Sequence, residues 1–205
     1  MRASLDWKRI AIFLGFAFGL AWLAALVLAL NGALADSPVL LPGTNLTLAL
    51  VLVAGPYMWA PALAHLLTRL VTREGWRDVG LRPLTRGWPY WLAAWVLPAG
   101  LTILGALVYF LAFPASYDPE LGVLRELLAK AGQAGLDPWF VAIVQTIQGI
   151  LIAPLINGFF TFGEEFGWRA YLQPKLMALG PRRAMLLMGV IWGVWHWPLI
   201  AMGHN

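Results

Sequence analysis

Four ionisable side chains between residues 160 and 200 have the types and spacing to activate a water molecule. Glu164, Glu165 and Arg169 lie in one short stretch, and His196 follows inside an apolar, tryptophan-rich segment. A carboxylate can act as a general base toward water. A neutral imidazole can hold the same water, directly or through a metal ion. These residue types predict hydrolysis, and a charged group inside an apolar segment is itself a sign of function.

Helical geometry distinguishes the two glutamates. Residues four apart share one face of an α-helix, so an ion pair between Glu165 and Arg169 forms easily. Glu164 points about 100° away around the same helix, because the helix has 3.6 residues per turn. Glu164 is therefore predicted to be the freer carboxylate and the general base.

A structural interpretation of the same residues is also open. Glu165 and Arg169 could belong to a solvated helix face with an ordinary ion pair. His196 could be a packed residue that is hydrogen-bonded to a neighbouring helix. His65, near the end of an earlier apolar segment, is predicted to be structural because the sequence offers it no partner.

The composition indicates that membrane spans position these residues. The chain is 60% hydrophobic and 12% charged, with a mean hydropathy of +0.73, whereas soluble domains are roughly 45–50% apolar and about 25% charged. We therefore predict an all-α fold, a polytopic transmembrane helix bundle that forms a single domain over residues 1–205. Cysteine is absent, which excludes disulfides and thiolate metal ligands. Any metal ion would have to bind His, Asp or Glu, and in the predicted site, if a metal such as zinc is used, these are His196 and Glu164.

Five apolar segments are long enough to cross a bilayer, because a span needs about 20 residues. They are predicted at residues 10–30, 46–70, 88–113, 139–160 and 184–202. A cleavable signal peptide is the alternative for the first segment, but its apolar core exceeds the roughly 7–15 residues of such peptides. The second segment carries Pro56 and Pro61, which predict a kinked helix.

The basic residues predict how these spans are oriented, because short loops rich in Lys and Arg stay in the cytoplasm. The N-terminus with Arg2, the loop 69–87 and the segment 161–183 are basic, whereas the loop 31–45 has no Lys or Arg and the loop after the third span is acidic. This alternation predicts a cytoplasmic N-terminus. The same alternation accounts for the basic residues, because they flank apolar runs. Nucleic acid is therefore not predicted as a partner.

The stretches around Glu164 and His196 together resemble the first two motifs of the CAAX-protease and bacteriocin-processing (CPBP) intramembrane endopeptidases. Glu164-Glu165-x-x-x-Arg169 resembles the first motif, and Trp192-x-x-x-His196 resembles the second. The stretch from Pro61 through Gly80-Leu81-Arg82 is also similar to bacterial members. The resemblance implies a helical enzyme whose cavity opens toward the cytosol. It also implies that Glu164 and His196 activate water while Glu165 and Arg169 shape the site or contact the substrate.

The same resemblance implies an integral protein of the bacterial inner membrane that hydrolyses membrane-associated peptides or proteins, with membrane lipid as its surroundings. It leaves zinc and a metal-free glutamate mechanism both open, and it leaves the oligomeric state open. The family usually has a third motif, a His with an Asn four residues later in a further span, and His204 does not fit it. We therefore expect a C-terminally truncated member. The alternative is a non-catalytic relative, such as a bacteriocin immunity factor or scaffold.

The two motifs can cooperate only if they lie at the same depth. Arg183 to His196 is about 20 Å of helix, whereas Glu164 lies near the predicted end of the fourth span. Either that span tilts or breaks at its proline and glycine residues, or Pro181 begins a short re-entrant turn. The sequence is compatible with both.

Overall fold

The computed structural model describes residues 5–79, 81 and 84–204. Over these residues the chain is helical and contains no strand beyond an isolated bridge between Val39 and Thr47. Four helices are long and apolar enough to cross a membrane, or five when a bent helix pair counts as one span. The predicted all-α, polytopic fold class is confirmed. Arg2, Gly80 and Arg82, which entered the sequence interpretation, lie outside the described residues.

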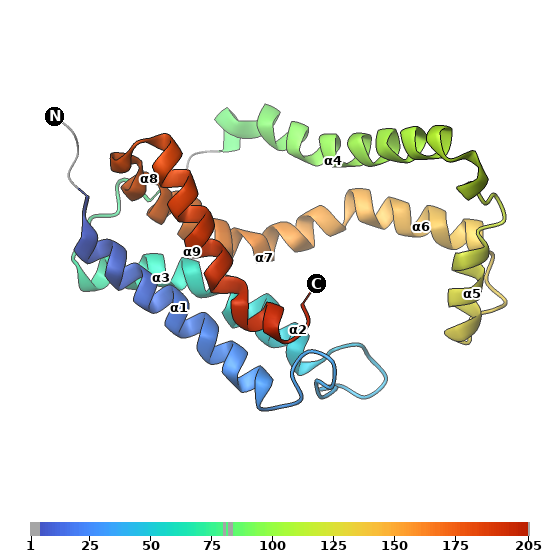
Figure 1. The fold of residues 1–205 in the computed structure, drawn as a ribbon, viewed down its shortest axis with the longest axis horizontal. Helices are drawn as coiled ribbons and strands as arrows, with labels where there is room; N and C mark the ends of the chain where they lie inside the picture. Colours follow the sequence, from blue (N-terminus) through green and yellow to red (C-terminus); the bar gives the residue numbers. More distant parts are fainter. Residues whose placement is uncertain (1–4, 80, 82–83, 205) are drawn as a thin grey trace. The chain divides into compact units, whose positions relative to one another are not determined.

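The chain divides into two compact units, one formed by residues 1–81 with 159–205 and the other by residues 82–158. The first unit contains all four predicted site residues, and Figure 1 labels its main helices. Its elements are α1 (Trp7–Ala29), α2 (Leu48–Leu52), η1 (Val53–Tyr57), α3 (Met58–Val71), the second half of α7 (Ala153–Gly167), η3 (Trp168–Leu172), α8 (Gln173–Leu176), η4 (Met177–Leu179) and α9 (Pro181–Ala201).

Small side chains let the helices of the first unit approach closely. Alanines recur along the buried face of α1 and again in α3, and they are almost fully buried. Without a hydrophobic driving force between helices in lipid, such small residues favour association by close backbone packing. Larger side chains fill the remaining space, where Phe13 of α1 meets Trp168 and Tyr171 of η3 with ring centroids 5.5 and 5.1 Å apart. This packing connects α1 directly to the segment that follows Glu164.

The second span is kinked as its prolines predict. Gly55 has non-helical angles (φ −87°, ψ −105°) just before Pro56, and the backbone there forms the wide turn η1 between α2 and α3. Proline cannot donate the helical hydrogen bond, so the break falls at this point. Pro61 instead stays inside the regular helix α3.

The helical segment that carries Glu164 is longer than the predicted fourth span, which was placed at 139–160. α6 (Pro138–Leu151) meets the next helix at a bend of 43°, and helical structure then continues through Leu179. The charged residues that suggested an early end therefore lie inside a helix. The chain reverses at Gly180, whose φ of +88° suits glycine because it has no Cβ. Gly180 lies midway in sequence between Glu164 and His196, and the two arms of this helical hairpin meet where Trp192 contacts Glu164.

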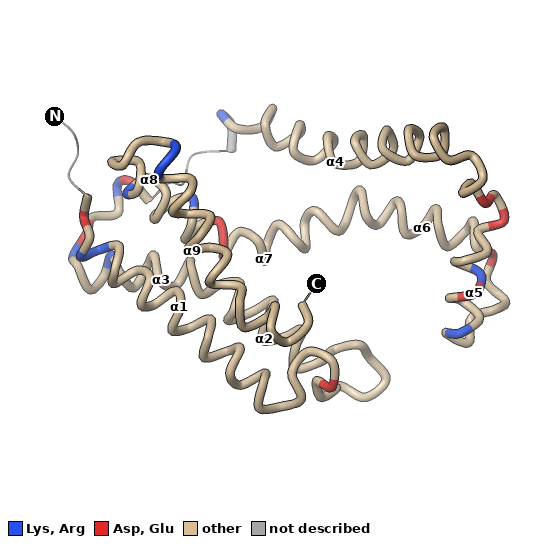
Figure 2. Tube along the Cα trace, viewed as in Figure 1, with Lys and Arg blue, Asp and Glu red and all other residues tan. Residues whose placement is uncertain are grey.

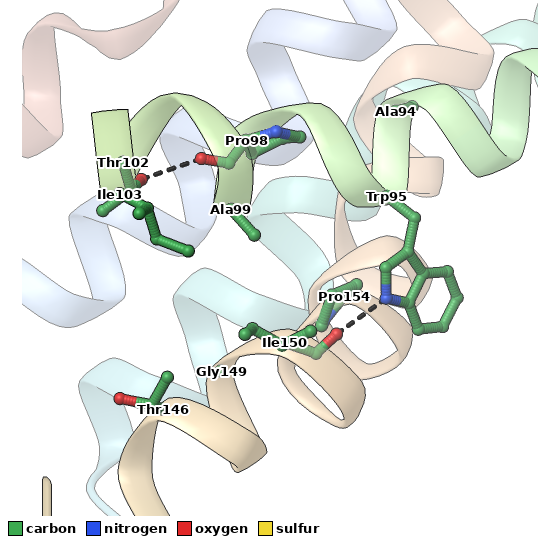
Figure 3. A pocket seen from close by; sticks show the side chains of 10 residues that line it. All are labelled: Ala94, Trp95, Pro98, Ala99, Thr102, Ile103, Thr146, Gly149, Ile150 and Pro154. Carbon is green, nitrogen blue, oxygen red and sulfur yellow. Dashed lines mark hydrogen bonds between the residues drawn. The ribbon is translucent and has the colours of Figure 1, made fainter. Parts of the chain in front are cut away.

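The second unit contains α4 (Leu84–Ala112), η2 (Pro114–Ser116), α5 (Gly122–Lys130), α6 and the start of α7. The Trp95 indole N–H donates to the Ile150 carbonyl at 2.7 Å and ties α4 to α6. A cavity of about 490 Å³ lies between these helices (Figure 3). The hydroxyl of Thr102, on its wall, donates to its own helix at the Pro98 carbonyl, so this wall is largely apolar.

Candidate active site

Glu164 lies on α7 and is buried, with 8% of its surface exposed. Its position depends on the flanking glycines. A Cβ on Gly163 would lie 2.8 Å from the Trp59 ring, and a Cβ on Gly167 would overlap the Pro61 backbone. These glycines, spaced as in small-xxx-small helix interfaces, therefore let α7 pack directly on α3. That close approach carries Glu164 into the interior of the unit.

Glu165 and Arg169 have a different environment from Glu164. Their side chains are 47% and 46% exposed, and Arg169 Nε lies 3.3 Å from Glu165 Oε2. This is the ion pair that the i, i+4 spacing predicts. The two adjacent glutamates are thus separated into one exposed, paired carboxylate and one buried carboxylate.

His196 lies on α9 and is half-buried. Its Nδ1 is 2.9 Å from the carbonyl of Trp192, one turn earlier in the helix. A carbonyl can only accept a hydrogen bond, so Nδ1 is assigned as the protonated nitrogen of a neutral ring. This assignment leaves Nε2 as the acceptor of the ring, the atom that could take a hydrogen bond or a proton from water.

Trp192 joins the two motifs, and the sequence interpretation assigned it no role of its own. Its indole N–H donates to Glu164 Oε1, and its ring meets the His196 ring with centroids 5.1 Å apart. The guanidinium of Arg169 lies over the same indole ring, 5.8 Å from its centroid. Glu164 and His196 are thus both in contact with one indole ring. The sequence shows Trp192 as part of the second motif, but only the fold brings it into contact with Glu164.

The neighbouring Trp195 fixes α9 against the rest of the unit. It is fully buried, its indole N–H donates to the Ala17 carbonyl at 3.2 Å, and its own carbonyl accepts the Tyr57 hydroxyl at 2.6 Å. The rings of Trp195 and Trp168 meet edge to face at 5.7 Å. α1, η1 and η3 therefore all determine where α9 places His196.

His65, predicted to be structural, has partners that explain its burial. The Arg69 Nε donates to its Nε2 at 2.7 Å, and its Nδ1 faces the Phe166 carbonyl at 3.0 Å. Arg69 is buried too, and it binds the Gly75 carbonyl and Asp78 Oδ1, the latter at 2.9 Å. The contact at Nδ1 thus joins α3 to the end of α7, whereas the contact at Nε2 comes from Arg69 on α3 itself. Arg69 is four residues after His65, a spacing that sequence reasoning could have used.

The donor set around Glu164 does not fit a catalytic zinc site. Among the described residues, no three His, Asp or Glu side chains gather closely enough to hold a metal ion. Catalytic zinc usually has three protein ligands and one water. Glu164 and His196 supply two at most, because the Glu165 carboxylate is paired with Arg169.

Comparison with known proteins agrees with the motifs. The family model of the Rce1-like type II CAAX prenyl endopeptidases matches residues 139–203, about a third of the chain. A search of curated proteins and a search of solved structures each gave no match. The matched segment contains Glu164, Trp192 and His196. Residues 139–203 are therefore similar to the Rce1-like membrane endopeptidases, which confirms the resemblance drawn from the two motifs.

Proposed function

We propose that this protein is an intramembrane endopeptidase in which Glu164 and His196 activate a water molecule. The observation that carries the proposal is the junction at Trp192, which binds the Glu164 carboxylate and packs against the His196 ring. The two residue types required for water activation thus belong to one group of contacts. The family match over the same segment supports hydrolysis of peptide bonds in membrane-associated peptides or proteins.

In the proposed reaction, Glu164 takes a proton from water as the water oxygen attacks the carbonyl carbon of the peptide bond. His196 Nε2 accepts a hydrogen bond from the same water and orients it. The proton then passes from Glu164 to the leaving amine as the C–N bond breaks, giving a new carboxyl end and a new amino end.

Glu165 and Arg169 have a supporting role in this proposal. Their ion pair lies beside Trp192, with the guanidinium over the indole. Arg169 can thus hold Trp192 in place, and its guanidinium has further N–H donors with which it can bind a peptide substrate. We place the site on the cytoplasmic side of a bacterial inner membrane, following the distribution of basic residues in the loops.

The test is cleavage of membrane peptides by the purified protein in lipid vesicles. Glu164→Gln keeps the shape of the side chain and an acceptor for Trp192 but removes the base. It should lower kcat/KM by about 100- to 10,000-fold, the range for loss of general acid–base catalysis. His196→Ala should have an effect of similar size, whereas Glu126→Gln, on the exposed helix α5, should leave activity unchanged. Equal cleavage by folded wild type and Glu164→Gln would defeat the proposed role of Glu164, whereas a folded wild type without cleavage would favour a non-catalytic immunity or scaffold protein.

A chelator separates the two mechanisms that the family resemblance leaves open. Because the described donor set does not fit catalytic zinc, activity should persist after metal removal verified by elemental analysis. Loss of activity that added zinc restores would contradict the metal-free route. It would also show that a further ligand outside the described site completes a metal centre.

A further inference from the structure

A second cavity lies in the first unit beside the proposed site. It has a volume of about 190 Å³ and is lined by Arg169 and Gln173 together with Met185, Met188, Gly189 and Trp192 of α9. Two of its lining residues already belong to the proposed site, because Trp192 donates a hydrogen bond to Glu164 and Arg169 lies over the Trp192 ring. The cavity therefore adjoins the carboxylate proposed to act on the peptide bond.

The size and lining of this cavity suit one side chain of a peptide. Pockets for drug-sized ligands occupy roughly 300–1,000 Å³, so a cavity of about 190 Å³ accommodates less than such a ligand. Met188 is buried and Met185 is 44% exposed, so the lining runs from the interior to the surface. Methionine side chains are flexible and polarizable, which lets them adapt to apolar groups of different shape.

Gly189 lines this cavity without a side chain, and no neighbouring helix requires a glycine at this position. A Cβ at Gly189 would meet no atom within 4 Å, unlike one at Gly163 or Gly167. Glycine inside a helix is unfavourable relative to alanine. No packing contact requires glycine at position 189, and this position lines the cavity.

We infer that this cavity is a specificity subsite that binds an apolar side chain next to the cleaved bond, and that Gly189 sets the largest side chain it admits. The inference rests on the proposed endopeptidase function. Arg169 and Gln173 stand at the polar part of the wall and can bind the peptide backbone. The two methionines and the open position at Gly189 receive the side chain.

The test measures kcat/KM for peptides that differ only in the residue next to the cleaved bond, carrying Ala, Met or Phe. Wild type should prefer Met over Ala by about 10- to 200-fold, the range of discrimination of hydrophobic pockets. Gly189→Leu fills the cavity and should lower kcat/KM for the Met peptide at least about tenfold, with the Ala peptide unaffected. Gly189→Ala should fall between wild type and Gly189→Leu.

Gly193→Leu is the matched control, because Gly193 lies on the same helix, has equally open space at its Cβ and does not line the cavity. It should not change the preference among the peptides. Cleavage that depends on Glu164 but keeps the wild-type preference in Gly189→Leu would overturn the subsite and leave the proposed function intact. An equal fall for all three peptides would also overturn it. Absence of any cleavage by wild type would overturn both.

Discussion

At the scale of single residues, the site shows how one helix gives two adjacent carboxylates different chemistry. Glu165 faces outward, and its charge is balanced by Arg169 at 3.3 Å. Glu164 faces inward, and its hydrogen-bond partner is the neutral indole of Trp192. An indole N–H orients a carboxylate without adding a positive charge. The two carboxylates therefore have different partners, a neutral donor for Glu164 and a cation for Glu165.

Trp192 is predicted to act as a positioning residue for Glu164. Trp192→Phe keeps an aromatic ring against His196 but removes the N–H that holds Glu164. Hydrogen bonds to charged groups contribute about 1.5–3 kcal/mol, and each 1.36 kcal/mol corresponds to tenfold in rate. Cleavage should therefore fall by about 10- to 150-fold in kcat/KM, measured on vesicles with a fixed peptide substrate.

The dependence of the rate on pH separates positioning from a merely structural role. If Trp192 tunes the carboxylate, Trp192→Phe should shift the pH–rate profile as well as lower it. A uniform fall at every pH, together with a lower melting temperature, would instead assign Trp192 to packing. Trp197→Phe, on the same helix but 61% exposed, controls for loss of an indole and should leave both readouts unchanged.

At the scale of elements, close contact between α7 and α3 determines where Glu164 lies. Gly167→Ala is expected to destabilise the protein, because the new Cβ would overlap Pro61. Overpacking of a filled interior costs about 1–3 kcal/mol. The thermal unfolding temperature in detergent should fall, and cleavage should fall with it as Glu164 moves.

Gly158 on the same helix provides the control for Gly167. A Cβ there would meet nothing within 4 Å, so Gly158→Ala should retain or raise stability, as alanine is the better helix former. If the two substitutions changed the unfolding temperature equally, the α7–α3 contact would not be the cause.

The sequence predicts interactions within one helix better than those between helices. The Glu165–Arg169 ion pair and the kink near Pro56 follow from local spacing and from the missing proline N–H, and the structure contains both. The continuation of helical structure through Leu179 does not follow from local spacing. The charged stretch from Glu164 to Arg169 resembles the end of a span until its tertiary partners are known. The contact of Trp192 with Glu164 likewise arises only when the hairpin at Gly180 brings α9 alongside α7.

At the scale of the whole molecule, charged residues gather where α1 begins and α3 ends (Figure 2). Glu74 accepts hydrogen bonds from Lys175 at 2.6 Å and from the Tyr171 hydroxyl at 2.8 Å, and Arg9 lies 3.5 Å away. The loop after α3 is thus joined to α1, η3 and α8. Burial raises the pKa of Glu74, but the bonds from Lys175 and Tyr171 lower it further, so the pKa lies below its usual value.

This lowered pKa gives the protein an acid-sensitive stability. Glu74 stabilises the folded state above its unfolded pKa of about 4.3, and that stabilisation is lost as pH falls through the lower folded value. Glu74→Gln should lower the free energy of unfolding at pH 7 by about 1–3 kcal/mol. It should also weaken the decline of stability between about pH 5 and pH 3. An unchanged acid transition, followed by circular dichroism in detergent, would show that other carboxylates govern it.

The orientation of the protein in the membrane is the largest-scale prediction, and the absence of cysteine makes it directly testable. Asn45 and Gln133 lie in loops predicted outside, while Arg77 and Arg182 lie in basic segments predicted inside, and all four are exposed. Because basic loops stay in the cytoplasm, a membrane-impermeant maleimide added to intact cells should label Asn45→Cys and Gln133→Cys. Arg77→Cys and Arg182→Cys should be labelled only after lysis, and the cysteine-free wild type never. The reverse pattern would place the basic loops and the Glu164 site on the outer side of the membrane. Labelling of Arg182→Cys alone in intact cells would show that the hairpin at Gly180 lies on the opposite side from the N-terminal basic loops.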